Sequence, residues 1–205
     1  MWHPLRLTEQ APGWYASDGG PADCVNLGVF WVMRERKPDI VLSGINHGAN
    51  LGEDLFYSGT VSAAREAAIL GIPAVALSLC GRGHFHFETA ARWALRITKQ
   101  VLSHRLPKGI FLNVNIPNVK PEEVTGIEVT RQGTRNYGAG IIEKKDPRGR
   151  AYYWISGTNP EYSNEPGTDA FAIHEKRVSI TPIHLDTTHY PTCEMLAHWK
   201  FEEDR

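Results

Sequence analysis

Strands alternate with helices between Pro21 and Pro117, and this pattern restricts the possible folds more than any other feature of the chain. Short, continuously apolar runs are typical of strands that a parallel sheet buries on both faces, and segments with apolar residues at helical spacing lie between them. The expected order is a helix at 22–36, a strand at 39–43, a helix at 60–70, a strand at 74–79, a helix at 87–102 and a strand at 110–116. This alternation predicts an α/β fold with a right-handed, parallel sheet.

The pattern changes from about Ile127 to alternating apolar and polar residues between clusters of Gly, Pro and Asp, which is typical of β-hairpins or an extended arm. A chain of 205 residues is long enough for one well-buried domain. We therefore expect a single domain with an α/β core at 1–126, a β-rich arm at 127–182 and a C-terminal helix at 183–205. Residues 1–20 look like strands and turns, with no phosphate-binding strand–helix unit before them.

Composition excludes several classes of partner. The formal net charge is -1, which gives no electrostatic reason to expect a nucleic-acid polymer or a membrane surface as a partner. Three widely spaced cysteines without a CxxC pair indicate neither a disulfide framework nor a cysteine metal site. The start lacks the apolar stretch of a signal peptide, and no run of about 18 apolar residues occurs. These features predict a cytoplasmic location.

A polar loop after the first buried strand is the expected site of the chemistry. It runs from Gly44 to about Gly59, and its glycines allow the backbone to approach a ligand closely. The amide oxygens of Asn46 and Asn50 are hard ligands suited to Mg²⁺ or Mn²⁺. Open α/β sheets bind their ligands beyond the carboxyl ends of the strands, where this loop begins.

A second short motif, Ser58-Gly59-Thr60, stands at the start of the next predicted helix. Ser58 or Thr60 could cap that helix through a side-chain oxygen. Alternatively, the unpaired N–H groups and the hydroxyls could hold a phosphate at the positive end of the helix. The residue types alone leave both interpretations open.

The order and spacing of nine blocks in this chain resemble those of the SurE family of 5'/3'-nucleotidases. The most specific are SGINHGANLG (43–52), YSGTVSAAREA (57–67) and GIPAVALS (71–78). The others are PADCV (21–25), LNVNIP (112–117), TRQGTR (130–135), DPRG (146–149), GTD (167–169) and VSITP (178–182). The resemblance therefore covers nearly the whole chain.

The resemblance implies a Rossmann-like α/β phosphatase that needs a divalent cation, Mg²⁺ or Mn²⁺, and hydrolyses nucleoside monophosphates. It implies that Asn46 is a metal ligand. From their places in the predicted fold, we expect the phosphate or substrate to be bound by Ser43, Gly44, Asn50, Ser58, Gly59 and Thr60. The family's arm exchanges between subunits, so we expect a homodimer or homotetramer, with Tyr152, Tyr153 and Trp154 at the interface rather than stacked on a nucleobase.

The family's remaining metal ligands are two adjacent aspartates in an Asn-Asp-Asp-Gly motif and a serine in a second loop. No Asp-Asp pair occurs in these 205 residues, and Leu5-Arg6-Leu7 resembles the segment that follows the serine loop. We therefore expect the first strand–helix unit to be missing, Met1 to be an internal start and the activity to be impaired, and we assign no catalytic residue. The alternative is a non-catalytic relative that binds nucleotide or acts as an assembly module.

Three nearby polar residues receive a more ordinary interpretation. Glu53 and Asp54 are expected to be solvated loop charges rather than substitute metal ligands. His47 is expected to be a bystander, although its type would suit acid–base chemistry near neutral pH.

Overall fold

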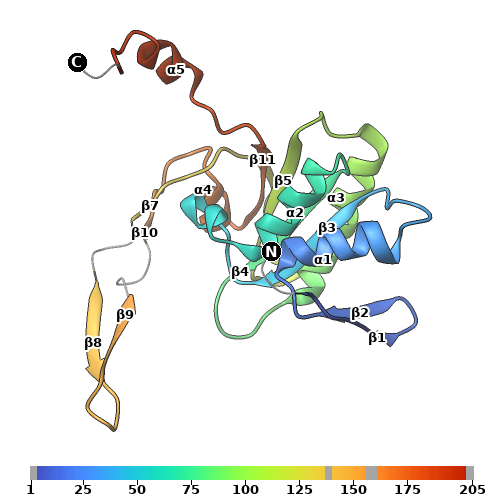
Figure 1. The fold of residues 1–205 in the computed structure, drawn as a ribbon, viewed down its shortest axis with the longest axis horizontal. Helices are drawn as coiled ribbons and strands as arrows, with labels where there is room; N and C mark the ends of the chain where they lie inside the picture. Colours follow the sequence, from blue (N-terminus) through green and yellow to red (C-terminus); the bar gives the residue numbers. More distant parts are fainter. Residues whose placement is uncertain (1–3, 137–139, 156–160, 202–205) are drawn as a thin grey trace.

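A mixed sheet of five strands forms the centre of the molecule, as seen in a computed structural model that describes residues 4–136, 140–155 and 161–201 (Figure 1). The strand order is β3 (Val41–His47), β4 (Ala74–Cys80), β5 (Ile110–Pro117), β11 (Arg177–His184) and β6 (Gly126–Val129). The strands β3, β4 and β5 are parallel, whereas β11 is antiparallel to β5 and parallel to β6. The predicted α/β class is confirmed, but the sheet is not wholly parallel.

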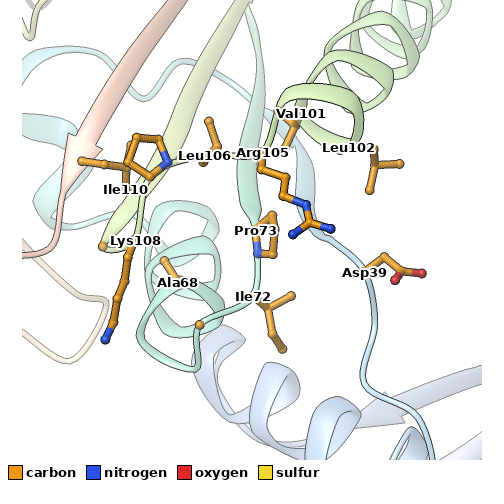
Figure 2. A pocket seen from close by; sticks show the side chains of 13 residues that line it. Asp39, Ala68, Ile72, Pro73, Val101, Leu102, Arg105, Leu106, Lys108 and Ile110 are labelled. Carbon is orange, nitrogen blue, oxygen red and sulfur yellow. The ribbon is translucent and has the colours of Figure 1, made fainter.

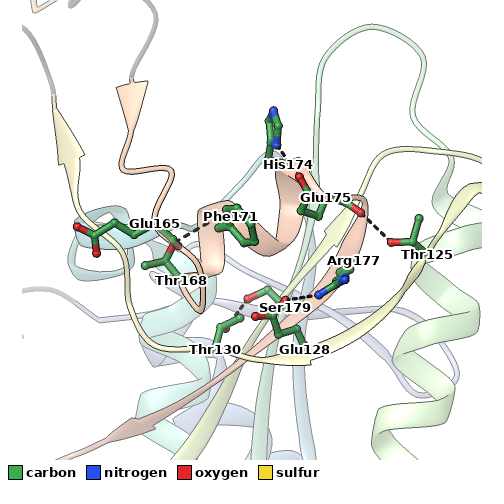
Figure 3. A network of polar contacts seen from close by, with 10 residues as sticks. All are labelled: Thr125, Glu128, Thr130, Glu165, Thr168, Phe171, His174, Glu175, Arg177 and Ser179. Atoms are coloured by element: carbon green, nitrogen blue, oxygen red, sulfur yellow. Dashed lines mark hydrogen bonds and ion pairs between the residues drawn. The ribbon is translucent and has the colours of Figure 1, made fainter.

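Two strands of the predicted arm, β6 and β11, belong to this central sheet. The connection 118–125 between β5 and β6 is shorter than the crossover of about a dozen residues that parallel strands need, so the chain reverses direction there. Side chains reinforce the edge: Arg177 pairs with Glu128 at 3.1 Å, and the hydroxyl groups of Thr130 and Ser179 lie 2.8 Å apart (Figure 3).

Helices cover both faces of the sheet. The helices in the described ranges are α1 (Pro21–Leu27), which continues as a π-helical turn at Gly28–Val32, α2 (Gly59–Ile69), α3 (Phe87–His104), α4 (Asp169–His174) and α5 (Tyr190–Leu196), of which α5 lies away from the sheet (Figure 1). Every residue of β4 is buried: Val75, Leu77 and Leu79 face a cluster that includes α3, whereas Ala74 and Ala76 pack with α2. The result is a three-layer arrangement in which the sheet is the middle layer. No helix in the described ranges is long and apolar enough to span a membrane.

The β-rich remainder of the predicted arm is a hairpin that extends away from the sheet (Figure 1). Its strands are β8 (Ile141–Lys145) and β9 (Ala151–Ile155), and β7 (Arg135–Asn136) pairs with β10 (Glu161–Tyr162) near the central body. Residues 137–139 and 156–160 of this stretch, and residues 202–205 of the predicted C-terminal helix, lie outside the described residues. At the other end of the chain, β1 (Leu7–Ala11) and β2 (Trp14–Ser17) form a second hairpin.

Element boundaries near the predicted loop differ from those expected. The strand β3 begins at Val41 and continues to His47, because its pairing with β4 resumes at Asn46 after a register shift that follows Ser43. The loop proper is therefore shorter, and it contains the 3-10 helix η2 (Gly52–Phe56). A further 3-10 turn, η3 (Pro121–Glu123), precedes β6.

Candidate functional site

The end of β3 places Asn46 at the carboxyl edge of the sheet, beside Ser78 of β4. The half-buried Asn46 side chain donates its Nδ2 hydrogen to the backbone oxygen of Gly48 at 3.1 Å. Within the described residues its Oδ1 atom has no hydrogen-bond partner, so this oxygen is available to a ligand.

Gly44 allows β3 to lie close to β4 just before Asn46. Its φ of +119° is rarely adopted by other residues, and an added Cβ would lie 2.4 Å from the backbone oxygen of Leu77. The preceding residue, Ser43, is a half-buried member of β3 and pairs with Ala76 of β4. A larger residue at position 44 would therefore displace the strand that ends in Asn46.

Asn50 fixes the loop to the sheet through a buried polar network. Its backbone N–H donates to Asn115 at 3.0 Å, its side-chain amide donates to Ser78 at 2.7 Å, and its backbone oxygen accepts from Asn113 at 2.8 Å. Asn50 is only 5% exposed. Substrate binding by Asn50 stays a prediction, and these contacts assign its side-chain N–H to holding the loop.

Asp169, which the sequence analysis did not single out as a site residue, holds the next part of the loop. The carboxylate is fully buried and accepts backbone N–H groups of Gly52 at 2.9 Å, Gly133 at 3.0 Å and Ala170 at 2.8 Å. Burial raises the pKa of Asp169, while these N–H donors act in the opposite direction. The only sequence signal was its place in the Gly-Thr-Asp block, directly after the Thr168 cap of α4.

The two hydroxyl groups at the start of α2 have different surroundings. Ser58 is the N-cap, and its Oγ accepts the N–H of Val61 at 3.1 Å, so the capping interpretation is confirmed for this residue. The Thr60 hydroxyl makes no hydrogen bond within the described part of the chain. Gly59 packs closely on α1, since an added Cβ would lie 2.9 Å from Cγ of Pro21.

Glu53 and Asp54 are partnered, and the expectation of solvated charges is wrong for Asp54, whose side chain is 16% exposed. Arg135 pairs with Asp54, and its backbone N–H donates to Glu53 at 2.6 Å. The hydroxyl of Tyr162 also donates to Asp54 at 2.8 Å; burial, and next Asp54, raise the pKa of Tyr162. These contacts join η2 to β7 and β10.

The remaining predicted residue, His47, lies against an aromatic ring rather than beside a carboxylate. Its ring centroid is 3.6 Å from that of Phe85. Within the described ranges, no three or more His, Cys, Asp or Glu side chains lie together in a group that could hold a metal ion. The Asn46 oxygen fits as one ligand of a hard cation, but the described residues alone do not complete a metal site.

A hollow of about 460 Å³ lies at the amino-terminal ends of β4 and β5, at the edge of the sheet opposite to the one that carries Asn46. Its lining includes Pro73, Leu102 and Ile110, and the Arg105 side chain points towards Asp39 (Figure 2). Because ligands of α/β sheets bind at the carboxyl ends of the strands, we place the site at Asn46 rather than here.

Comparison with known proteins agrees with these features. Residues 1–139 match the family model described as survival protein SurE. The chain is 50% identical over 200 residues to a protein named 5'-nucleotidase SurE from Geobacter sulfurreducens, which covers 97% of this chain and 76% of that one. A protein of the same name from Pelobacter propionicus is 50% identical over 199 residues, covering 97% and 80%.

The fold is similar to that of a solved structure as well. The crystal structure of the SurE protein from Aquifex aeolicus matches with a TM-score of 0.85 and 44% sequence identity. The match covers 97% of this chain and 80% of that chain.

Proposed function

Because the chain belongs to the SurE family, we propose that it hydrolyses nucleoside monophosphates to nucleoside and phosphate. The observation that best supports this is the pairing of two features near one edge of the sheet. The Asn46 oxygen is available at the end of β3, and helix α2 packs against that strand. Relatives that are half identical to this chain are named as 5'-nucleotidases.

The first turn of α2 is suited to hold the phosphate. Among the described residues, the backbone N–H groups of Gly59 and Thr60 have no hydrogen-bond partner, and the Thr60 hydroxyl is close by in the chain. Helix starts bind anions through such N–H groups and the positive end of the helix dipole. The same donors would offset the charge that develops on the phosphoryl oxygens during transfer.

We propose Mg²⁺ or Mn²⁺ as the cofactor, with Asn46 supplying one oxygen ligand. A divalent cation at a phosphatase site polarises the phosphoryl oxygen and lowers the pKa of a bound water molecule. A neutral amide holds such an ion only weakly by itself, and no group of three or more His, Cys, Asp or Glu side chains accompanies it in the described ranges. We therefore expect slow turnover by these 205 residues.

The same observation favours a second candidate function, nucleotide binding without hydrolysis. The N–H groups of α2 need no metal to bind a phosphate. The two candidates differ in whether phosphate is released.

The decisive experiment measures phosphate release and Mn²⁺ affinity for the 205-residue chain with a nucleoside monophosphate, with and without a chelator. We expect cation-dependent release for the wild-type chain. Asn46→Ala should weaken Mn²⁺ binding about tenfold, or ~1.4 kcal/mol. Asn164→Ala is the matched control, because Asn164 is exposed and makes no side-chain hydrogen bond in the described part of the chain.

Equal Mn²⁺ affinity in Asn46→Ala and wild type would remove Asn46 from the metal site. Nucleotide binding without any phosphate release would replace hydrolysis by the second candidate function.

A further inference from the structure

We propose that the Tyr57 ring is a stacking platform for the nucleobase, an inference that rests on the proposed function. Tyr57 is 83% exposed, the largest exposed fraction among the large hydrophobic side chains that the structure describes. It directly precedes the Ser58 cap, so its α-carbon lies about 3.8 Å from that of the N-cap. The residue that carries this exposed aromatic ring therefore directly precedes the turn to which we assign the phosphate.

The backbone that holds Tyr57 is fixed on both sides. Its N–H donates to the backbone oxygen of Asp54 at 3.1 Å, and the Asp54 carboxylate is held in turn by Arg135 and Tyr162. Leu55, two residues earlier, is only 2% exposed and anchors η2 in the core. The exposure of Tyr57 thus belongs to an anchored segment, and the position of its α-carbon relative to α2 is set.

The ring itself is uncommitted. In the described ranges Tyr57 has no side-chain hydrogen bond, ion pair or ring contact, whereas Tyr162 donates to Asp54 and Tyr190 to Asp186. Aromatic rings are usually stabilised by burial, and a tyrosine placed at a binding surface offers a rigid apolar face. The Tyr57 ring can receive a flat ligand without breaking an existing contact.

The chemistry of the substrate matches this arrangement. In a nucleoside monophosphate the sugar separates the phosphate from the base. A phosphate at the N–H groups of Gly59 and Thr60 would leave the base to be placed over neighbouring surface, where Tyr57 is the adjacent ring. Stacking on an aromatic side chain is tolerant of base identity, because every base has a π-face. The proposal therefore predicts acceptance of several bases.

The test compares the binding of a ligand that contains a base with the binding of one that lacks it. Calorimetry would measure the affinity of the 205-residue chain for adenosine 5'-monophosphate and for ribose 5-phosphate, both with Mn²⁺ present. Tyr57→Ala should weaken binding of the nucleotide about tenfold and leave binding of ribose 5-phosphate unchanged. Tyr57→Trp should retain nucleotide affinity, and Tyr190→Ala is the control, since Tyr190 is 62% exposed on α5, which lies far from α2 (Figure 1).

Each other outcome overturns a defined part of the proposal. If Tyr57→Ala binds both ligands as the wild type does, or loses both equally, the ring does not stack on the base, while the phosphate site stands. If the wild-type chain binds neither ligand, the phosphate site fails and the stacking platform fails with it. Circular dichroism of each variant shows whether the fold is intact.

Discussion

At the scale of single residues, the start of α2 shows how one turn can serve stability and binding through different atoms. Ser58 uses its oxygen to satisfy the N–H of Val61, one of the donors that every helix leaves unpaired at its start. The hydroxyl of Thr60 has no such partner within the described residues. The two side chains should therefore respond differently to removal.

We predict that Ser58→Ala lowers stability by ~1 kcal/mol, the usual cost of a lost N-cap. Thr60→Val keeps the shape of the side chain, so it should leave the melting temperature almost unchanged and weaken nucleotide binding several-fold, about 1 kcal/mol for one hydrogen bond. Thermal unfolding and calorimetric titration of both variants provide the measurements. A Thr60→Val variant with wild-type nucleotide affinity would show that this hydroxyl lies outside the phosphate site.

Sequence reasoning found those site residues whose signals are local. Asn46 and Ser58 stand in short motifs next to a strand end and a helix start, and both occupy these places in the structure. The role of Asp169 could not be read in this way, because its partners Gly52 and Gly133 are 117 and 36 positions away. Within the described residues this buried carboxylate is bound by backbone N–H groups and by no side chain, so residue types give no sign of its partners.

At the scale of elements, the β8–β9 hairpin presents apolar side chains that the rest of the described chain does not cover. Ile141 is 72% exposed, Tyr153 61% and Trp154 57%. A two-stranded ribbon of this kind is marginal by itself, and its open edges favour pairing with another chain.

We predict that the wild-type chain is a dimer or tetramer, and that replacing 141–155 with a short Gly/Ser linker yields a monomer. Exposed apolar surface on the hairpin supplies the driving force for association. Sedimentation velocity measures both states, and circular dichroism checks that the truncated arm leaves the core folded. A monomeric wild-type chain would contradict the prediction.

The direction of strand β11 was not predicted from the sequence. The strand β11, which contains the VSITP block (178–182), is antiparallel to β5, although a parallel sheet was predicted. An apolar strand buried on both faces shows the same residue pattern in either direction, so local sequence distinguishes the two poorly. By contrast, helices α2 and α3 begin within one residue of their predicted starts, because the Ser58 cap of α2 and the apolar spacing of α3 are local signals.

At the scale of the whole molecule, the sheet ends on one side at β3, an edge strand beside a hollow of about 560 Å³. Val25, Val29 and Met33 line this hollow, and Leu42 of β3 is 44% exposed beside it. With a net charge of only -1, electrostatic repulsion offers little protection against association of this apolar edge.

We predict that the 205-residue chain binds the dye ANS and loses solubility near neutral pH, and that Leu42→Lys reduces both effects. A lysine on an edge strand opposes pairing with another chain. Fluorescence titration and the soluble fraction after centrifugation test this. Ile69→Lys is the control, because Ile69 is 59% exposed on α2 rather than on β3; an equal effect of both variants would exclude a role specific to β3.

The Asp169 junction also has a consequence for the order of events in folding. It joins Gly52 to a residue 117 positions later, so it can close only after most of the chain has been brought together. Asp169→Asn should therefore accelerate unfolding about tenfold, given ~1–3 kcal/mol for a buried N–H left without an acceptor, and should leave the folding rate nearly unchanged. Stopped-flow measurements, with Asp146→Asn in the β8–β9 turn as a control, would detect this; a slower folding rate would mean that the junction forms early. If the junction closes last, the loop that follows Asn46 is the final part of the chain to become ordered, and the ability to bind substrate arises only once folding is complete.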